Sequence, residues 1–161
     1  MRASKGGTPA LVALSAAEVQ HSVHPYDHDP RSDVGYGREA VEALGLPADQ
    51  VFKTLLAEVD GTVTVAVVPV TRSLDLKALA AAVGGKRATM ADPTTAQRAT
   101  GYVVGGISPL GQRTKHPTVV DRSVTDHDTV YVSGGRRGLD VGLSPQDLVR
   151  LTAATVAPIA R

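Results

Sequence analysis

The chain has 161 residues, of which 42% are apolar, and its formal net charge at pH 7 is +1. This length and composition predict one domain with a sizeable core, and the small charge argues against a protein that coats nucleic acid. The absence of cysteine excludes disulfides, thiolate metal sites and cysteine nucleophiles, and no segment reads as a signal peptide or a membrane span. We therefore expect a soluble cytoplasmic protein, with residues 1–8 as a disordered extension and residues 9–161 as the single domain.

Helical and strand patterns alternate along the chain. Aromatic residues are scarce, so the core must consist of aliphatic residues, many of them β-branched, which favours a central sheet. Asp60-Gly61 is a typical hairpin turn, and Asp92 and Ser144 each precede a proline as helix N-caps do. The pattern predicts helices at 9–20, 38–44, 74–83, 93–98 and from 145 onward, and strands at 21–26, 51–59, 62–70, 87–90, 118–121, 129–133 and 139–143. Hairpins and helical connections together predict an α/β fold with helices on a mixed sheet.

The segment 100–111, here called the glycine loop, holds four glycines and one proline within twelve residues. Glycine tolerates positive φ and lets backbone N–H groups approach a ligand closely. We predict a binding loop flanked by strands. A second glycine-rich segment, 133–138, follows a predicted strand; it is either an anion-binding nest with arginines beside it or a plain hairpin turn.

Two charged residues stand inside predicted strands. Lys53 interrupts an apolar run, where a buried ammonium needs a partner or a ligand. Asp140 likewise lies inside a predicted strand, where a buried carboxylate needs a partner or a ligand. Strand alternation also allows either side chain to face solvent. Both are candidates for ligand contacts.

Other chemistry has weaker support. Carboxylates flank a histidine at 26–30 and at 126–128, but neighbouring residues rarely converge on one metal ion, so loop roles are favoured there and no metal or cofactor is expected. The basic pairs at 86–87, 113–115 and 136–137 fit a solvated surface better than a phosphate contact. There is no G-x-S-x-G elbow, P-loop or dinucleotide fingerprint, while a Ser-His-Asp triad stays open. These signals favour a small ligand held by backbone amides without a protein nucleophile.

Taken together, several segments closely resemble the YbaK family of free-standing Cys-tRNA(Pro) deacylases, which are related to the editing domain of bacterial prolyl-tRNA synthetases. The resemblance covers residues 9–155. It is carried by segments 26–30, 52–55, 90–92, 100–111, 133–139 and 145–148.

This resemblance implies a mixed α/β fold with a curved, barrel-like sheet and peripheral helices. It also implies a hydrolase that cleaves the ester between a wrong amino acid and the 3′-terminal adenosine of tRNA. The family's essential lysine matches Lys53. The other matched site residues are the tyrosines Tyr26 and Tyr102, the loop glycines Gly101, Gly105 and Gly106, and the pair Ser133 and Asp140.

The matched residues receive roles from the same resemblance. Lys53 would hold the terminal phosphate or ribose, and amides of Gly105 and Gly106 would contact the aminoacyl carbonyl. Asp140 would bind the substrate α-ammonium or ribose hydroxyls, with Ser133 hydrogen-bonding nearby. For cysteinyl substrates the thiol would attack its own ester, a lyase-like step that asks the protein mainly for positioning.

The expected partners are the aminoacylated 3′ end of tRNA(Pro) and prolyl-tRNA synthetase, with no membrane. Two other functions stay open at this point. One is the same hydrolysis with Ala-tRNA(Pro) or another small aminoacyl ester as the substrate. The other is a non-catalytic module that binds tRNA or a synthetase.

Overall fold

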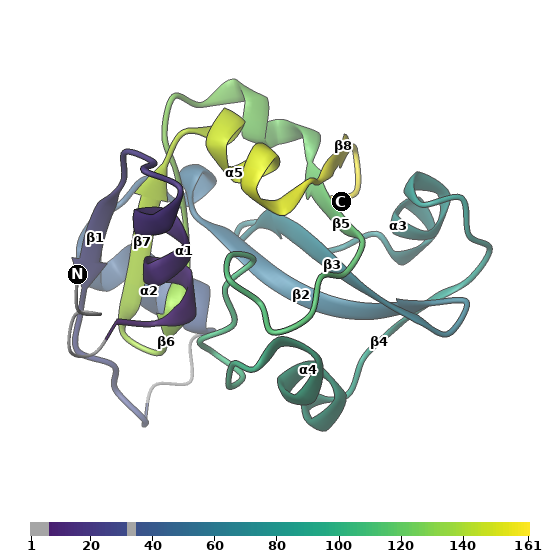
Figure 1. Cartoon of the computed structure of the whole chain (residues 1–161), viewed down its shortest axis with the longest axis horizontal. Helices are drawn as coiled ribbons and strands as arrows, with labels where there is room; N and C mark the ends of the chain where they lie inside the picture. Colours follow the sequence, from purple (N-terminus) through teal and green to yellow (C-terminus); the bar gives the residue numbers. More distant parts are fainter. Residues whose placement is uncertain (1–6, 32–34) are drawn as a thin grey trace.

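Two β-sheets lie next to each other in the computed structural model, which describes residues 7–31 and 35–161. The strands are β1 (Ser22–Pro25), β2 (Phe52–Val59), β3 (Thr62–Pro69), β4 (Ala88–Met90), β5 (Thr118–Asp121), β6 (Val130–Arg136), β7 (Leu139–Leu143) and β8 (Thr155–Ala157). The smaller sheet has the order β1-β7-β6 and the larger sheet the order β4-β2-β3-β5-β8. Figure 1 shows the smaller sheet at the left and the long strands β2 and β3 across the centre.

Two of the helices begin where their capping residues predict. The helices are α1 (Pro9–Ala16), α2 (Tyr36–Leu44), α3 (Leu76–Ala82), α4 (Pro93–Thr100) and α5 (Pro145–Thr152). Asp92 Oδ1 accepts the Thr95 N–H at 2.7 Å, and Ser144 Oγ accepts the Asp147 N–H at 3.1 Å, so both predicted N-caps are confirmed. Within the described ranges, no helix is long and apolar enough to cross a membrane.

The hairpin of β2 and β3 organises the larger sheet. Asp60 (φ 49°) and Gly61 (φ 84°) both adopt positive φ, as a type I′ turn requires, and Val59 pairs with Thr62 across it. β3 then pairs with β5 in parallel, and β5 pairs with β8 in parallel. The predicted mixed α/β fold is confirmed.

Side chains of β2 alternate between two cores. Phe52 and Leu56 belong to a core shared with the smaller sheet and with α1, α4 and α5. Ala57 and Val59 belong to a second core beneath α3. Because successive side chains of a strand point to opposite faces, Thr54 lies on the face of the first core and Lys53 on the face of the second.

The two sheets separate along the first half of β2. Val51 forms a parallel bridge with Tyr131 where β6 begins, while β4 pairs with β2 at residues 57–59 and no further. Among the residues described, no strand covers the edge of β2 at residues 52–56, so a wedge opens between this edge and β6. Closure of the sheets into a barrel stays a prediction.

Several boundaries differ from those the sequence predicts. Helix α1 ends at Ala16 instead of residue 20, because the backbone turns through a positive φ at Glu18. Strand β8 was not predicted, since three residues, two of them exposed, carry no periodic signal. Of the predicted disordered extension, residues 1–6 lie outside the described residues, whereas Thr8 caps α1 and its hydroxyl donates to the Gly134 carbonyl.

Candidate functional site

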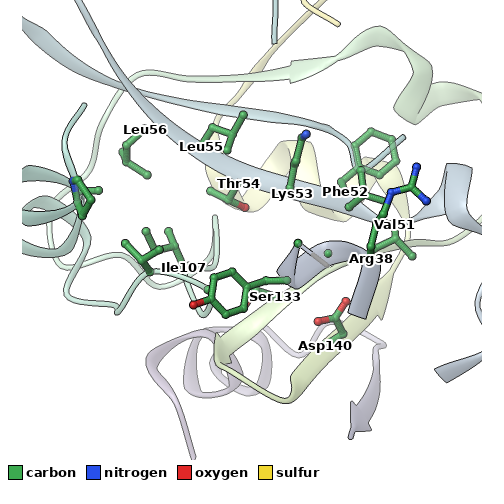
Figure 2. Close-up of a pocket in the computed structure, with 18 of the residues that line it drawn as sticks. Arg38, Val51, Phe52, Lys53, Thr54, Leu55, Leu56, Ile107, Ser133 and Asp140 are labelled. Carbon is green, nitrogen blue, oxygen red and sulfur yellow. The ribbon is translucent and has the colours of Figure 1, made fainter. Parts of the chain in front are cut away.

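A pocket of about 510 Å³ occupies the wedge between β2 and the smaller sheet. Its walls come from Val51 and residues 52–56 of β2, the first turn of α2, the glycine loop and the strands β6 and β7. Figure 2 shows the strand β2 crossing above the pocket, with Ser133 and Asp140 below it and Ile107 at the opposite end from Arg38. Five of the eight sequence-predicted residues line it: Tyr26, Lys53, Gly105, Ser133 and Asp140.

Ser133 and Asp140 face each other across neighbouring strands. They are direct partners in the register of β6 and β7, which follows from the hairpin that joins these strands. Asp140 is 6% exposed, and burial raises the pKa of its carboxyl to about 7. Ser133 Oγ accepts the Gly135 N–H at 3.2 Å, so its own proton is available for a ligand. This side of the pocket therefore offers a carboxyl that a cation would stabilise.

Tyr26 lines the pocket next to this carboxyl. Its backbone N–H donates to the Gly138 carbonyl at 2.9 Å, which anchors the chain leaving β1 to the turn between β6 and β7. Burial, and then the charges of Asp140 and Glu39, raise the pKa of Tyr26 to about 12. The phenol therefore stays protonated and can donate a hydrogen bond at neutral pH.

Two cations line another part of the pocket. Burial, and then the nearby Arg38 guanidinium, lower the pKa of the Lys53 ammonium. Arg38 comes from the first turn of α2, whose N-cap Gly35 has no side chain to cap the helix. In the described part of the chain, neither cation has a carboxylate within ion-pair distance. An anionic ligand group would relieve their mutual repulsion.

The glycine loop follows helix α4 and does not lie between strands, so that prediction is wrong. Gly101 (φ 82°) ends α4 in the left-handed conformation, where glycine is favoured. Tyr102 is buried in the first core, and its hydroxyl donates to the Leu110 carbonyl at 2.6 Å. Neither lines the pocket; both stabilise the loop from within.

The paired glycines of the loop have different surroundings. Gly105 (φ 89°) lines the pocket, and a Cβ there would lie 2.6 Å from the Tyr36 ring. Gly106 does not line it: its N–H donates to the Val103 carbonyl at 2.9 Å, and a Cβ would meet the backbone of Arg136 at 2.7 Å. The Gly106 amide is thus engaged in a turn, which leaves Gly105 as the better candidate for contact with a substrate carbonyl.

The segment 133–138 contains the turn of a β-hairpin, which is one of the two structures that its sequence predicts. β6 continues through a bulge to Arg136, and the turn itself is Arg137-Gly138. Arg137 Nε donates to the Val104 carbonyl at 2.9 Å, and its guanidinium lies 5.3 Å from the centre of the Tyr36 ring. The segment therefore connects the smaller sheet to the glycine loop and to α2.

Sequence reasoning missed three polar side chains that line the pocket: Tyr36, Arg38 and Thr54. Tyr36 was placed in a polar loop, although Gly35 as an N-cap could have indicated an earlier start of α2. Thr54 follows Lys53 directly, and strand alternation alone shows that only one of the two can share a face with Phe52. No local signal tells which face borders a pocket. Among the described residues, no three His, Asp or Glu side chains gather as a metal-binding group.

A family model described as the aminoacyl-tRNA editing domain matches residues 34–151. The chain belongs to the aminoacyl-tRNA editing domain family. The match contains α2, β2, the glycine loop, β6 and β7, which are the elements that build the pocket. The resemblance stated from the sequence is therefore confirmed.

The chain is also similar in sequence or structure to individual proteins. A protein of Enterococcus faecalis that carries the name of a Cys-tRNA(Pro)/Cys-tRNA(Cys) deacylase, EbsC, is 36% identical over 119 residues, 73% of each chain. The proline–tRNA ligase of Maridesulfovibrio salexigens is 33% identical over 104 residues, which are 62% of this chain but 17% of the ligase. A crystal structure described as a trans-editing enzyme for prolyl-tRNA synthetase covers 99% of both chains with a TM-score of 0.83 at 24% identity, which supports the fold.

Proposed function

We propose that this protein is a trans-acting aminoacyl-tRNA deacylase that hydrolyses the ester of Cys-tRNA(Pro). The observation that carries the proposal is the charge arrangement of the pocket: a buried carboxyl at Asp140, with no ion pair to any described residue, and two cations at Lys53 and Arg38. An aminoacylated tRNA end carries a positive α-ammonium and negative phosphates within a few bonds of the ester. The name of the Enterococcus faecalis relative points to the same substrate.

Each charged group then binds one part of the substrate. Asp140 binds the α-ammonium, which restores the ionised form that burial disfavours, and Ser133 and Tyr26 donate hydrogen bonds beside it. Lys53 and Arg38 hold the phosphate of the terminal nucleotide. The Gly105 N–H contacts the carbonyl oxygen and stabilises the negative charge that develops there. The protein binds and orients the ester, and no side chain acts as a nucleophile.

The nucleophile in this proposal is the thiol of the substrate. Its sulfur attacks the carbonyl carbon of its own ester, and a carbon–sulfur bond forms as the bond to the terminal ribose oxygen breaks. The thiol proton ends on the released hydroxyl. Water then opens the four-membered thiolactone and gives free cysteine. Holding sulfur and carbonyl in a reactive geometry supplies much of the acceleration, as in other intramolecular reactions.

Turnover of Cys-tRNA(Pro) by wild-type protein and by Lys53→Ala tests the proposal. We expect Lys53→Ala to lose about 100-fold in kcat/KM while staying folded, because one preorganised charge is removed from a substrate contact. Lys77→Ala is the matched control, since Lys77 is an exposed lysine on α3 that does not line the pocket. A folded Lys53→Ala protein with full activity would contradict the role of Lys53, and a wild-type protein without deacylase activity would contradict the function.

The variant Ser133→Ala distinguishes attack by the substrate thiol from attack by the Ser133 hydroxyl. If the substrate thiol attacks, the variant keeps appreciable turnover because Ser133 contributes only a hydrogen bond. Complete loss of chemistry in a folded variant would indicate a serine nucleophile instead.

A further inference from the structure

The Thr54 hydroxyl is a buried polar group without a partner. Among the buried side-chain nitrogen and oxygen atoms of the described residues, Thr54 Oγ1 is the one that has no hydrogen-bond partner. Leaving such a group unpaired costs free energy, and native proteins rarely tolerate it without a reason. In a pocket wall, the reason to consider first is a ligand that supplies the missing partner.

Thr54 lies at the apolar end of the pocket. It shares the face of β2 with Phe52 and Leu56, opposite to Lys53. Figure 2 shows the Thr54 side chain on the side of β2 that faces Ile107, away from the Lys53 ammonium. Ala96 of α4 lines the same pocket and belongs to the same core. The hydroxyl is thus one polar atom among aliphatic walls.

The backbone of β2 is also open at this point. The Leu56 carbonyl accepts the Ala91 N–H at 3.0 Å on the edge that faces away from β3. Strand geometry directs the backbone groups of Thr54, two residues earlier, to the same edge. No strand within the described ranges pairs with that edge at residue 54. A ligand in the wedge therefore meets both a hydroxyl and unpaired backbone groups.

We propose that Thr54 is the specificity contact for the side chain of the substrate amino acid. The substrate thiol lies at the apolar end and hydrogen-bonds the Thr54 hydroxyl, which is buried in the ligand-free structure and turns toward the pocket by a change of χ1 rotamer. This inference rests on the proposed function, because it places a cysteinyl ester in the pocket. It extends that function by naming the protein group that recognises the side chain of the substrate amino acid.

The chemistry of this end favours a thiol over its nearest competitors. An alanyl side chain is too short to reach the hydroxyl and leaves it unpaired, so binding gains nothing at Thr54. A seryl hydroxyl would find the same partner, but it loses more hydration than a thiol on entering aliphatic walls. A thiol behaves as a small apolar group with a weak S–H donor, which fits both features of the wall.

The test compares Thr54→Val with Thr54→Ser, which removes or keeps the hydroxyl. The probes are 3′-deoxy-3′-aminoadenosine amides of cysteine and of 2-aminobutyrate, in which a methyl group replaces the thiol and no ester can be cleaved. Affinities are measured by calorimetry, and deacylation of Cys-tRNA(Pro) and Ala-tRNA(Pro) is followed in parallel. Thr62→Val at the exposed start of β3 is the matched control.

We expect wild type to prefer the cysteinyl amide to the aminobutyryl amide by about fivefold, the size of one net hydrogen bond. Thr54→Val abolishes this preference, Thr54→Ser keeps it and Thr62→Val does not change it. Turnover of Cys-tRNA(Pro) falls in Thr54→Val alone, and Ala-tRNA(Pro), which lacks the thiol nucleophile, is not cleaved by any of these proteins. An unchanged preference in folded Thr54→Val protein overturns the inference, whether or not the ester is hydrolysed. A wild-type protein that shows the preference but no turnover contradicts only the proposed hydrolysis.

Discussion

Asp140 is held in surroundings that disfavour its charge. The carboxyl is 6% exposed, has no cation within ion-pair distance in the described residues, and titrates near pH 7 because of burial. A residue kept for packing alone would be apolar, since a buried carboxylate without a partner destabilises the fold. Ionisable groups with strongly shifted pKa values concentrate at functional sites, which is the pattern seen here.

This shift predicts how stability depends on pH. The folded protein holds the Asp140 proton up to about pH 7, whereas the unfolded chain releases it near the ordinary aspartate pKa of 3.8. Stability contributed by this group therefore falls as pH rises from about 4 to about 7 and is constant above. We expect Asp140→Asn to be more stable than wild type at pH 8 by about 2–4 kcal/mol, and little different at pH 4.

Urea unfolding of both proteins across this pH range measures the difference. Subtracting one curve from the other cancels the carboxyls whose pKa values are lowered on folding, such as Asp121, which contribute the opposite slope. The same variant is expected to lose deacylase activity, because it removes the partner of the α-ammonium. An Asp140→Asn protein that is less stable at pH 8 would show that the carboxylate has a partner in the fold.

At the scale of elements, the glycine loop is positioned by helix α2. The Tyr36 ring packs over Gly105, and Arg137 lies against the same ring while bonding the Val104 carbonyl. Behind them, Glu39 accepts a hydrogen bond from His28 at 2.7 Å, which links α2 to the segment after β1. Three segments distant in the sequence therefore set the position of one backbone amide.

Gly105→Ala tests this packing against Gly84→Ala as a matched control. Both glycines have positive φ, but a Cβ at Gly84 meets nothing within 4 Å, whereas one at Gly105 meets the Tyr36 ring at 2.6 Å. We expect Gly84→Ala to cost about 1 kcal/mol of unfolding free energy, the strain of the backbone alone. Gly105→Ala should cost about 2–3 kcal/mol and most of the activity.

Chemical denaturation gives both free energies, and deacylation of Cys-tRNA(Pro) gives the activity. Adding Tyr36→Ala to Gly105→Ala should recover part of the lost stability, because the clash is removed while the backbone strain stays. Equal costs for the two glycine variants would argue that Tyr36 moves away freely and does not position the loop.

Local signals predicted the elements well and the contacts between them poorly. The hairpin at Asp60-Gly61 and the caps at Asp92 and Ser144 depend on neighbouring residues, so the sequence carries them directly. Tyr102 was matched to the pocket by resemblance, yet its place in the core depends on Leu110 and on packing from other elements. The bulge in β6 likewise arises from pairing with β7 and leaves no local periodicity.

At the scale of the whole molecule, the pocket exists because two sheets share one bridge and then diverge. Lys53 comes from the larger sheet, Asp140 from the smaller one and Arg38 from helix α2, which precedes both in the sequence. Alternation could predict that Lys53 and Thr54 face opposite ways, but not which edge of β2 stays unpaired. Which edge stays unpaired depends on the strand order, and the strand order depends on pairing between distant segments that no single segment reveals.

The net charge of the chain bears on how the protein selects one tRNA over another. With a formal net charge of +1, the chain gains little from general attraction to a polyanion, and the pocket itself offers two cations to phosphate. We expect such a protein to contact the aminoacylated end and few other parts of the tRNA. Selection of tRNA(Pro) therefore needs a second binding surface, and we expect prolyl-tRNA synthetase to supply it.

Steady-state deacylation with and without the synthetase tests this expectation. Tethering the substrate to a partner raises its effective concentration, so synthetase should lower KM for Cys-tRNA(Pro) by about tenfold or more. KM for Cys-tRNA(Cys) should not change, because the synthetase does not select that tRNA, and kcat should stay the same for both, because the pocket is unaltered. Without the synthetase, the two substrates should be cleaved alike. Tight, salt-insensitive discrimination between them by the deacylase alone would contradict the need for a second surface, since it would require tRNA contacts beyond the pocket.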